Sequence, residues 1–212
     1  MSGCDIDNDF VQRTFAALSA AGDATADVRL SQAATQLPFE NNRFHAVYSN
    51  GVFEHCAQMP SLIAEVRRVL IPGGIFLIAF PLRCVIVEQH LWLPLVHWFS
   101  KGPMQRLLIR TTRPLCNPEA RWRSCQSIEQ YLQNDVFYWT SQQVRQVINQ
   151  NFENTTSLAK DYLRAFKKQG DRHSLLRLLL AATTVAPLSW IIEQLILFQW
   201  TYIIEASDPI KK

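Results

Sequence analysis

The sequence has few glycines, no closely paired cysteines and no hydrophobic run long enough to cross a membrane. Its 212 residues include seven glycines, and no two of them form a G-x-G turn. This argues against a glycine-rich loop that cradles phosphates. The five cysteines include no C-x-x-C pair. That spacing predicts reduced thiols in a cytoplasmic protein, with neither a disulfide framework nor a metal site.

The most apolar part of the chain lies near its C-terminal end. Residues 178–192 carry no charge, but they number fifteen and include Pro187. A membrane-spanning helix needs roughly 20 apolar residues, so we expect an apolar helical insertion over 160–197 instead. The first ten residues, MSGCDIDNDF, contain three acids and no apolar run. They are therefore not expected to form a signal peptide.

Charge is unevenly distributed along the chain. The formal net charge is +3, yet residues 82–126 contain seven Arg or Lys and two Glu, which leaves +5 there and −2 elsewhere. A basic patch on a nearly neutral body indicates either an anionic partner or a solvated charged face. Residues 82–126 are also rich in aromatics. We interpret them as a basic and aromatic lid inserted into a single domain that spans residues 1–212.

Short apolar segments alternate with helical patterns along the chain, which predicts an α/β fold with a parallel sheet. Pro72 and the Gly73–Gly74 pair are expected to end the second helix, because proline cannot continue a helix and glycine accepts a left-handed cap. Thr140 and Gln143 form a capping box at the start of the third helix. The expected strands are 2–6, 28–30, 44–49, 75–80, 155–159 and 198–206, and the expected helices are 8–21, 61–70 and 140–151.

Residues 37–81 carry a recognisable arrangement of short motifs. In order they are LPF at 37–39, Glu-His at 54–55 and RVLIPGG at 68–74. This segment resembles the second half of the S-adenosylmethionine (SAM) binding domain of class I methyltransferases, the type 11 methyltransferase domain. The resemblance implies a Rossmann-like, doubly wound sheet with strand order 3-2-1-4-5-7-6, in which this segment supplies strands four and five.

One element of that family is missing from the sequence. Family members have a first strand that ends in a G-x-G-x-G turn, whereas here Met1 immediately precedes the expected second strand. The fold is therefore expected to be incomplete at its N-terminus, and the second strand must pair directly with the fourth or the sheet is frayed. Three interpretations remain: a truncated methyltransferase, a non-catalytic relic, or a protein that binds SAM by an altered route.

The resemblance also implies a set of cofactor residues. Asp5, followed by Ile6, stands at the end of the second strand, where an acid accepts hydrogen bonds from a ribose diol. A helix-capping or surface acid is the other interpretation of Asp5. Ala34 occupies a position near the adenine where many members carry an acid, so only backbone groups remain for that contact. Asn50 follows the fourth strand and is expected to meet the methionine part of SAM.

The acceptor side of the implied site is polar. Glu54 and His55 form a candidate acid/base pair, because an imidazole can take a proton from an acceptor near neutral pH. The pair can equally serve to order the helix that follows. Glu88, His90 and His97 lie in an insertion resembling one found in some type 11 methyltransferases, and they are candidates for the substrate side. Nearby aromatics would supply an apolar wall or simply pack the lid.

Together these features predict a SAM-dependent methyltransferase that acts on a small-molecule or lipid-linked acceptor. The alternative is a non-catalytic peripheral membrane or interaction module on a methyltransferase-like scaffold, because basic residues beside Trp and Leu suit an anionic bilayer interface. Nucleic-acid binding is not expected, since the arginines lack a stacking or glycine-rich context. The expected location is the cytoplasm, with membrane association as the variant that the alternative requires.

Overall fold

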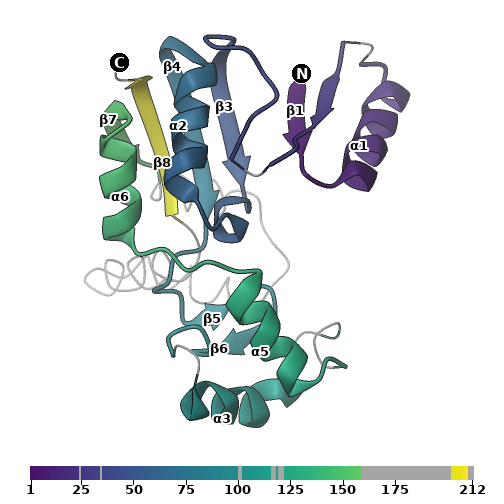
Figure 1. Ribbon diagram of the computed structural model, residues 1–212, viewed down its shortest axis with the longest axis vertical. Helices are drawn as coiled ribbons and strands as arrows, with labels where there is room; N and C mark the ends of the chain where they lie inside the picture. Colours follow the sequence, from purple (N-terminus) through teal and green to yellow (C-terminus); the bar gives the residue numbers. More distant parts are fainter. Residues whose placement is uncertain are drawn as a thin grey trace, which may run out of the picture.

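The computed structural model describes residues 1–23, 25–33, 35–99, 102–115, 118, 122–158 and 202–209. The expected insertion over 160–197 lies outside these residues. Within them, helices and strands alternate as the mixed α/β prediction requires (Figure 1). No helix in the described part of the chain is both long enough and apolar enough to cross a bilayer.

The central element is a four-stranded mixed sheet. Its strands β3 (Phe44–Asn50), β4 (Leu70–Phe80), β8 (Tyr202–Pro209) and β7 (Phe152–Ser157) lie side by side in that order. β3 and β4 are parallel, whereas β8 is antiparallel to both β4 and β7. This order agrees with the 4-5-7-6 half of the sheet that the family resemblance implies.

The N-terminal segment forms a separate small unit. β1 (Ser2–Asp5) and β2 (Asp27–Leu30) pair in parallel, and α1 (Asn8–Ala20) connects them. β1 does not pair with β3, so the direct contact between second and fourth strands is not formed. No strand of the described residues lies between the two sheets, and Figure 1 shows this unit beside the larger sheet.

Helix α2 (Met59–Val69) packs against the four-stranded sheet through Leu62, Ile63 and Val66, all buried. Its end differs from the prediction. The chain leaves the helix at Leu70, whose backbone is extended, two residues before Pro72. Proline disfavours helical geometry in Ile71, the residue before it, so the helix would not be expected to continue to Pro72.

The Pro-Gly-Gly sequence therefore serves β4 and not the helix. Between its pairings at Leu70 and Ile75, β4 shifts register against β3. Gly73 has a φ of +76° in this irregular stretch, and a Cβ on Gly74 would lie 2.9 Å from the carbonyl oxygen of Ile71. Glycine is thus required at a bulge, where it lets the backbone fold closely on itself.

Helix α6 (Ser141–Asn149) begins as the sequence predicts. Thr140 is its N-cap and Gln143 completes a capping box. The buried side chains of Val144 and Ile148 join the core between α6, α2 and the sheet. Figure 1 shows α2 and α6 on the same side of the sheet.

The segment after β4 builds a second, smaller core. It contains β5 (Val87–Glu88), β6 (Leu93–Pro94), α3 (Pro103–Thr112) and the short helix η2 (Arg113–Leu115), and it packs against α5 (Cys125–Asn134). Leu93, Val96 and Ile109 from the lid meet Ile128 and Leu132 of α5 in this core, and all five are buried. The lid therefore has a core of its own, and only its first residues, such as Leu82, are buried in the core of the larger sheet.

Candidate functional site

A short helix, η1 (Phe53–His55), follows the carboxyl end of β3 and positions the first two polar side chains. Phe53 is fully buried, and its ring centroid lies 5.9 Å from that of Phe76 and 5.8 Å from that of Phe80, both in β4. Gly51 makes the turn into this helix with a φ of +67°. The phenyl anchor therefore fixes where the next residues, Glu54 and His55, are presented.

Glu54 is a buried carboxylate, with only 2% of its surface exposed. Its Oε2 atom has no hydrogen-bond partner among the described residues. Burial raises the pKa of Glu54, because removal from water disfavours the charged form, and the nearby histidines oppose that rise. A buried carboxylate oxygen without a partner is costly, and the described residues supply none to Glu54 Oε2.

The segment between α5 and α6 holds η1 in place. The Nδ1 atom of His55 lies 2.6 Å from the carbonyl oxygen of Asp135, to which it donates. The backbone N–H of Phe137 donates to the carbonyl oxygen of Glu54 at 2.6 Å. Because a carbonyl can only accept, the proton of a neutral His55 sits on Nδ1 and its lone pair on Nε2.

Glu88 and His90 form a second pair, carried by the lid. Glu88 is 1% exposed, and its Oε1 lies 2.7 Å from His90 Nδ1. Its Oε2 accepts the N–H of Leu91, also at 2.7 Å. The hydrogen bond that His90 donates to Glu88 raises the pKa of His90, while burial acts to lower that pKa. Glu88 thereby fixes both the ring orientation and the tautomer of His90.

The two pairs converge. The ring of His90 lies 5.0 Å from the ring of His55 and 6.1 Å from that of Tyr131. Ligating atoms of Glu54, His55 and His90 all lie within 4.8 Å of one another. Of the residues that the sequence assigned to the acceptor side, Glu54, His55, Glu88 and His90 thus lie together near the carboxyl end of β3, whereas His97 does not belong to this group. We call Glu54, His55 and His90 the Glu-His-His cluster.

Of the sequence-predicted cofactor residues, Asp5 lies far from that cluster along the chain, whereas Asn50 shortly precedes it. Asp5 ends β1, and its Oδ1 accepts the N–H of Asp7 at 2.9 Å. The cap of α1 is Asp7, which accepts from Asp9 and Phe10. Helix capping is therefore not the role of Asp5.

The remaining cofactor candidates are less constrained. Asn50 is exposed at the end of β3, and Ile6 is 63% exposed. Ala34 lies outside the described residues. Next to it, the hydroxyl of Ser31 donates to backbone oxygens of the same loop, which gives that loop a defined shape.

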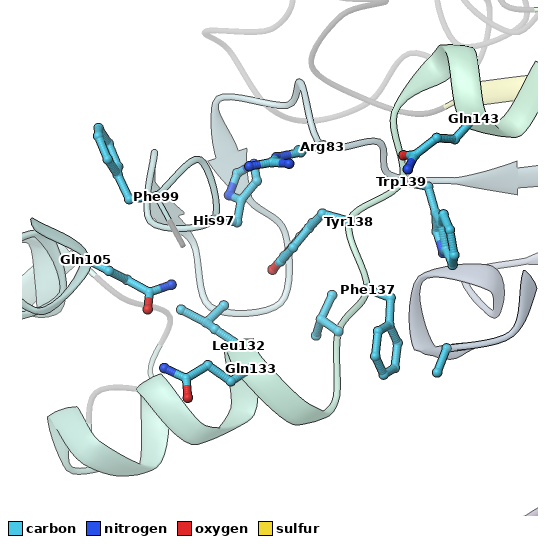
Figure 2. A pocket seen from close by; sticks show the side chains of 12 residues that line it. Arg83, His97, Phe99, Gln105, Leu132, Gln133, Phe137, Tyr138, Trp139 and Gln143 are labelled. Carbon is cyan, nitrogen blue, oxygen red and sulfur yellow. The ribbon is translucent and has the colours of Figure 1, made fainter. Parts of the chain in front are cut away.

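A pocket of about 380 Å³ lies between the lid and the segment joining α5 to α6 (Figure 2). His97 and Gln105 of the lid and Tyr138 of the connecting segment are among the residues lining it, and Figure 2 shows them turned toward one another. His97 and Gln105 are buried, and His97 Nδ1 and Gln105 Oε1 have no hydrogen-bond partner among the described residues. Sequence reasoning singled out His97 but missed Gln105 and Tyr138, because neither lies in a motif.

Arg68 holds the backbone of the LPF motif in place. Its guanidinium donates to the carbonyl oxygens of Leu37 and Phe39 at 3.0 and 2.7 Å and to both carboxylate oxygens of Glu65. Glu65 in turn accepts the N–H of Leu37 at 3.0 Å. Arg68 and Glu65 both lie in α2, and their contacts hold in place the loop that leads into β3.

Comparison with known families identifies the N-terminal part of the chain. Residues 1–78 match the family model described as a methyltransferase domain. This segment is therefore similar to methyltransferase domains. The match runs from β1 into β4, so the resemblance seen in residues 37–81 is confirmed and extends back over the N-terminal unit. The match supports SAM as the cofactor. A comparison with curated protein sequences found no match.

Solved structures share the fold at low sequence identity. A geranyl diphosphate methyltransferase in complex with SAM is 13% identical, with a TM-score of 0.51 over 99% of this chain and 68% of its own. A protein named as a candidate methyltransferase, solved with the Haloferax volcanii activator Trm112, is 16% identical, with a TM-score of 0.53 over 100% of this chain and 72% of its own.

The cyclase SpnF is a third similar structure. It is 12% identical, with a TM-score of 0.51 over 99% of this chain and 66% of its own. The chain therefore spans about two thirds of the length of these structures. At such identities the likeness shows the Rossmann-like fold alone, since one fold serves several chemistries.

Proposed function

We propose that the chain binds SAM at the carboxyl ends of β1 and β3 and transfers its methyl group to a small-molecule or lipid-linked acceptor. The observation that carries this proposal is the convergence of Glu54, His55 and His90 at the carboxyl end of β3. In doubly wound sheets the ligand binds beyond the carboxyl ends of the strands. The family match over residues 1–78 supplies the cofactor class.

The residues at the end of β1 fit part of the cofactor. One oxygen of Asp5 is used by the N–H of Asp7, and the carboxylate has further acceptor capacity for the hydroxyls of a ribose. Asn50, exposed at the end of β3, can contact the amino acid part of SAM. The cofactor would supply an activated methyl group. The chain would bind it and orient it against the acceptor, which can lower the barrier substantially without further chemistry.

On the acceptor side, His55 and His90 are suited to receive or hold a proton. Glu88 fixes His90 at 2.7 Å, and the carbonyl of Asp135 fixes His55 at 2.6 Å. A proton lost by the acceptor hydroxyl or amine would pass to one of these imidazoles. Glu54 and His55 also hold η1 in place through their hydrogen bonds to residues 135–137. This supports the other interpretation, in which the pair orders the local structure, and that role is compatible with proton transfer.

The pocket of Figure 2 supports an acceptor with both apolar and polar parts. Leu132, Val136 and Phe137 give it apolar walls, while His97 and Gln105 bring buried polar atoms without protein partners. Ordered polar partners are expected at such atoms. We assign this pocket to the part of the acceptor that does not react.

The alternative, a non-catalytic membrane or interaction module, finds less support. Of the lid arginines, Arg106 pairs with Glu129 at 3.0 Å and Arg123 lies over the ring of Tyr131. Arg113 donates to the sulfur of Cys125 at 3.9 Å. These side chains contribute to the packing of α3 and α5. Their contacts within the protein give less support to a patch that serves only to bind a membrane.

Calorimetric titration with SAM and with its demethylated product tests the proposal. Binding at micromolar affinity should fall at least about tenfold in Asp5→Ala, because the ribose loses a charged hydrogen-bond partner. Asp9→Ala is the matched control, since Asp9 is an acidic residue on the exposed first turn of α1. The proposal fails if folded wild-type chain gives no binding heat, or if Asp5→Ala binds as tightly as the control.

A further inference from the structure

We infer that the Glu-His-His cluster is a binding site for a divalent metal ion of the zinc type. The inference concerns the acceptor side of the proposed function, but its evidence is independent of SAM binding. It begins with donor chemistry: one carboxylate and two imidazoles are a ligand set used by zinc, with a fourth coordination position left open. The described residues contain no other comparable group of His, Cys, Asp and Glu.

The carboxylate provides the first structural argument. Glu54 is 98% buried, by difference from its exposed 2%, and its Oε2 has no protein partner within the described residues. A bound cation would offset the cost of keeping this charge away from water.

The histidines provide the second argument. Histidines that bind metals usually donate their other ring N–H to a carboxylate or a backbone carbonyl. Both arrangements occur here. His90 Nδ1 faces Glu88 Oε1 at 2.7 Å, and His55 Nδ1 faces the carbonyl oxygen of Asp135 at 2.6 Å. Each contact leaves the lone pair of the neutral ring on Nε2, the nitrogen that would bind the ion.

The distances between the ligand atoms show how far the side chains must move to bind an ion. The three ligand atoms lie within 4.8 Å of one another. Ligands around tetrahedral zinc stand about 3.3 Å apart, given bond lengths of about 2.0–2.2 Å, so the ligand atoms must approach one another by up to about 1.5 Å. Rotation of the two imidazoles about their side-chain bonds can supply this movement. An oxygen ligand, such as a water or an acceptor hydroxyl, would then occupy the open position. With both imidazoles bound to the ion, neither has a lone pair left for the acceptor's proton, and the ion itself would favour loss of that proton from the bound oxygen.

Zinc titration of the purified chain, followed by competition with a chromophoric chelator, tests the inference without SAM. The expected result is one ion per chain with a dissociation constant near or below about 1 μM, since three protein ligands converge on it. Glu54→Gln and His90→Gln should each weaken binding at least tenfold. His45→Gln is the matched control and should leave the affinity unchanged. His45 is an exposed histidine near the start of β3, whereas the site follows the end of that strand.

X-ray absorption at the zinc edge of the loaded wild-type chain adds a measurement that needs no variant. Two imidazoles with oxygen donors in the spectrum would support the site, whereas sulfur donors would assign the ion to the cysteines and overturn it. Absence of zinc binding, or binding that Glu54→Gln and His90→Gln leave intact, would also overturn it. A chain that binds zinc as described but not SAM would refute the proposed function alone.

Discussion

Glu88 accepts a hydrogen bond of 2.7 Å from His90, and both residues belong to the lid. This contact orients the His90 ring, which lies 5.0 Å from the ring of His55 after β3. Substitution of Glu88 by Gln should weaken zinc binding by about 10- to 100-fold, because loss of an orienting partner typically costs that much. Chelator competition at neutral pH measures the change. Equal zinc affinity in Glu88→Gln and wild type would mean that Glu88 has only a structural role.

A second prediction concerns pH and the loop of the LPF motif. Arg68 lowers the pKa of Glu65 by direct hydrogen bonding, with a further contribution from the N–H of Leu37. Glu65 therefore adds stability that is fully present above the ordinary glutamate pKa of about 4.3 and is lost as pH falls through the lowered folded value. Glu65→Gln should accordingly be less stable than wild type at pH 7, and the difference should shrink below about pH 4.

Urea unfolding at a series of pH values from neutral to acid measures this effect. Glu153→Gln, at an exposed position of β7, controls for the loss of one negative charge. A Glu65→Gln deficit that stays constant down to pH 3 would contradict the assigned cause.

A third prediction tests the capping box of α6. Thr140→Ala removes the hydroxyl that accepts the N–H of Gln143 at 3.3 Å and should lower the free energy of unfolding by about 1 kcal/mol. Thr140→Ser retains a hydroxyl and should stay close to wild type. Chemical denaturation of the three proteins distinguishes them, and a Ser variant as unstable as the Ala variant would assign the effect to lost methyl packing.

The N-terminal unit should be the least protected part of the described fold. Its sheet has two strands, and Val11 is the one buried residue of α1, while Phe10 and Phe15 are 55% and 48% exposed. Two-stranded sheets are marginal in water. Amide hydrogen exchange in β1 and β2 should therefore be faster than in β4 by about 100-fold or more. Comparable protection in the two regions would show that another element covers this unit.

Local signals predicted much of this architecture. The Thr140–Gln143 pattern placed a helix start to the residue, because a cap is made by atoms three positions apart. The end of α2 was predicted less well. Pro72 and Gly73 were read as its stop, yet they shape a bulge in β4, since a proline acts first on the residue before it.

Less of the candidate site than of the fold could be predicted from the sequence. Glu54 and His55 could be singled out because they adjoin the end of a strand, and His90 because it lies in a resembling insertion. Their convergence as a metal ligand set could not be derived, since it depends on where the lid folds back over β3. The carbonyl of Asp135 and the side chain of Gln105 carry no residue-type signal of their function and were missed for that reason.

The position of β8 in the sheet has a consequence for how the protein is made. Tyr202 pairs with Phe80, and Ala206 pairs with both Phe76 and Thr155, so the strand that joins β4 to β7 comes from residues 202–209. On the ribosome, β4 and α2 emerge long before the strand that completes their sheet. Such distant pairings fold slowly, and Phe76, Ile78 and Phe80 stay partly uncovered in the meantime. The sheet therefore cannot be completed until residues 202–209 are available to pair with β4 and β7.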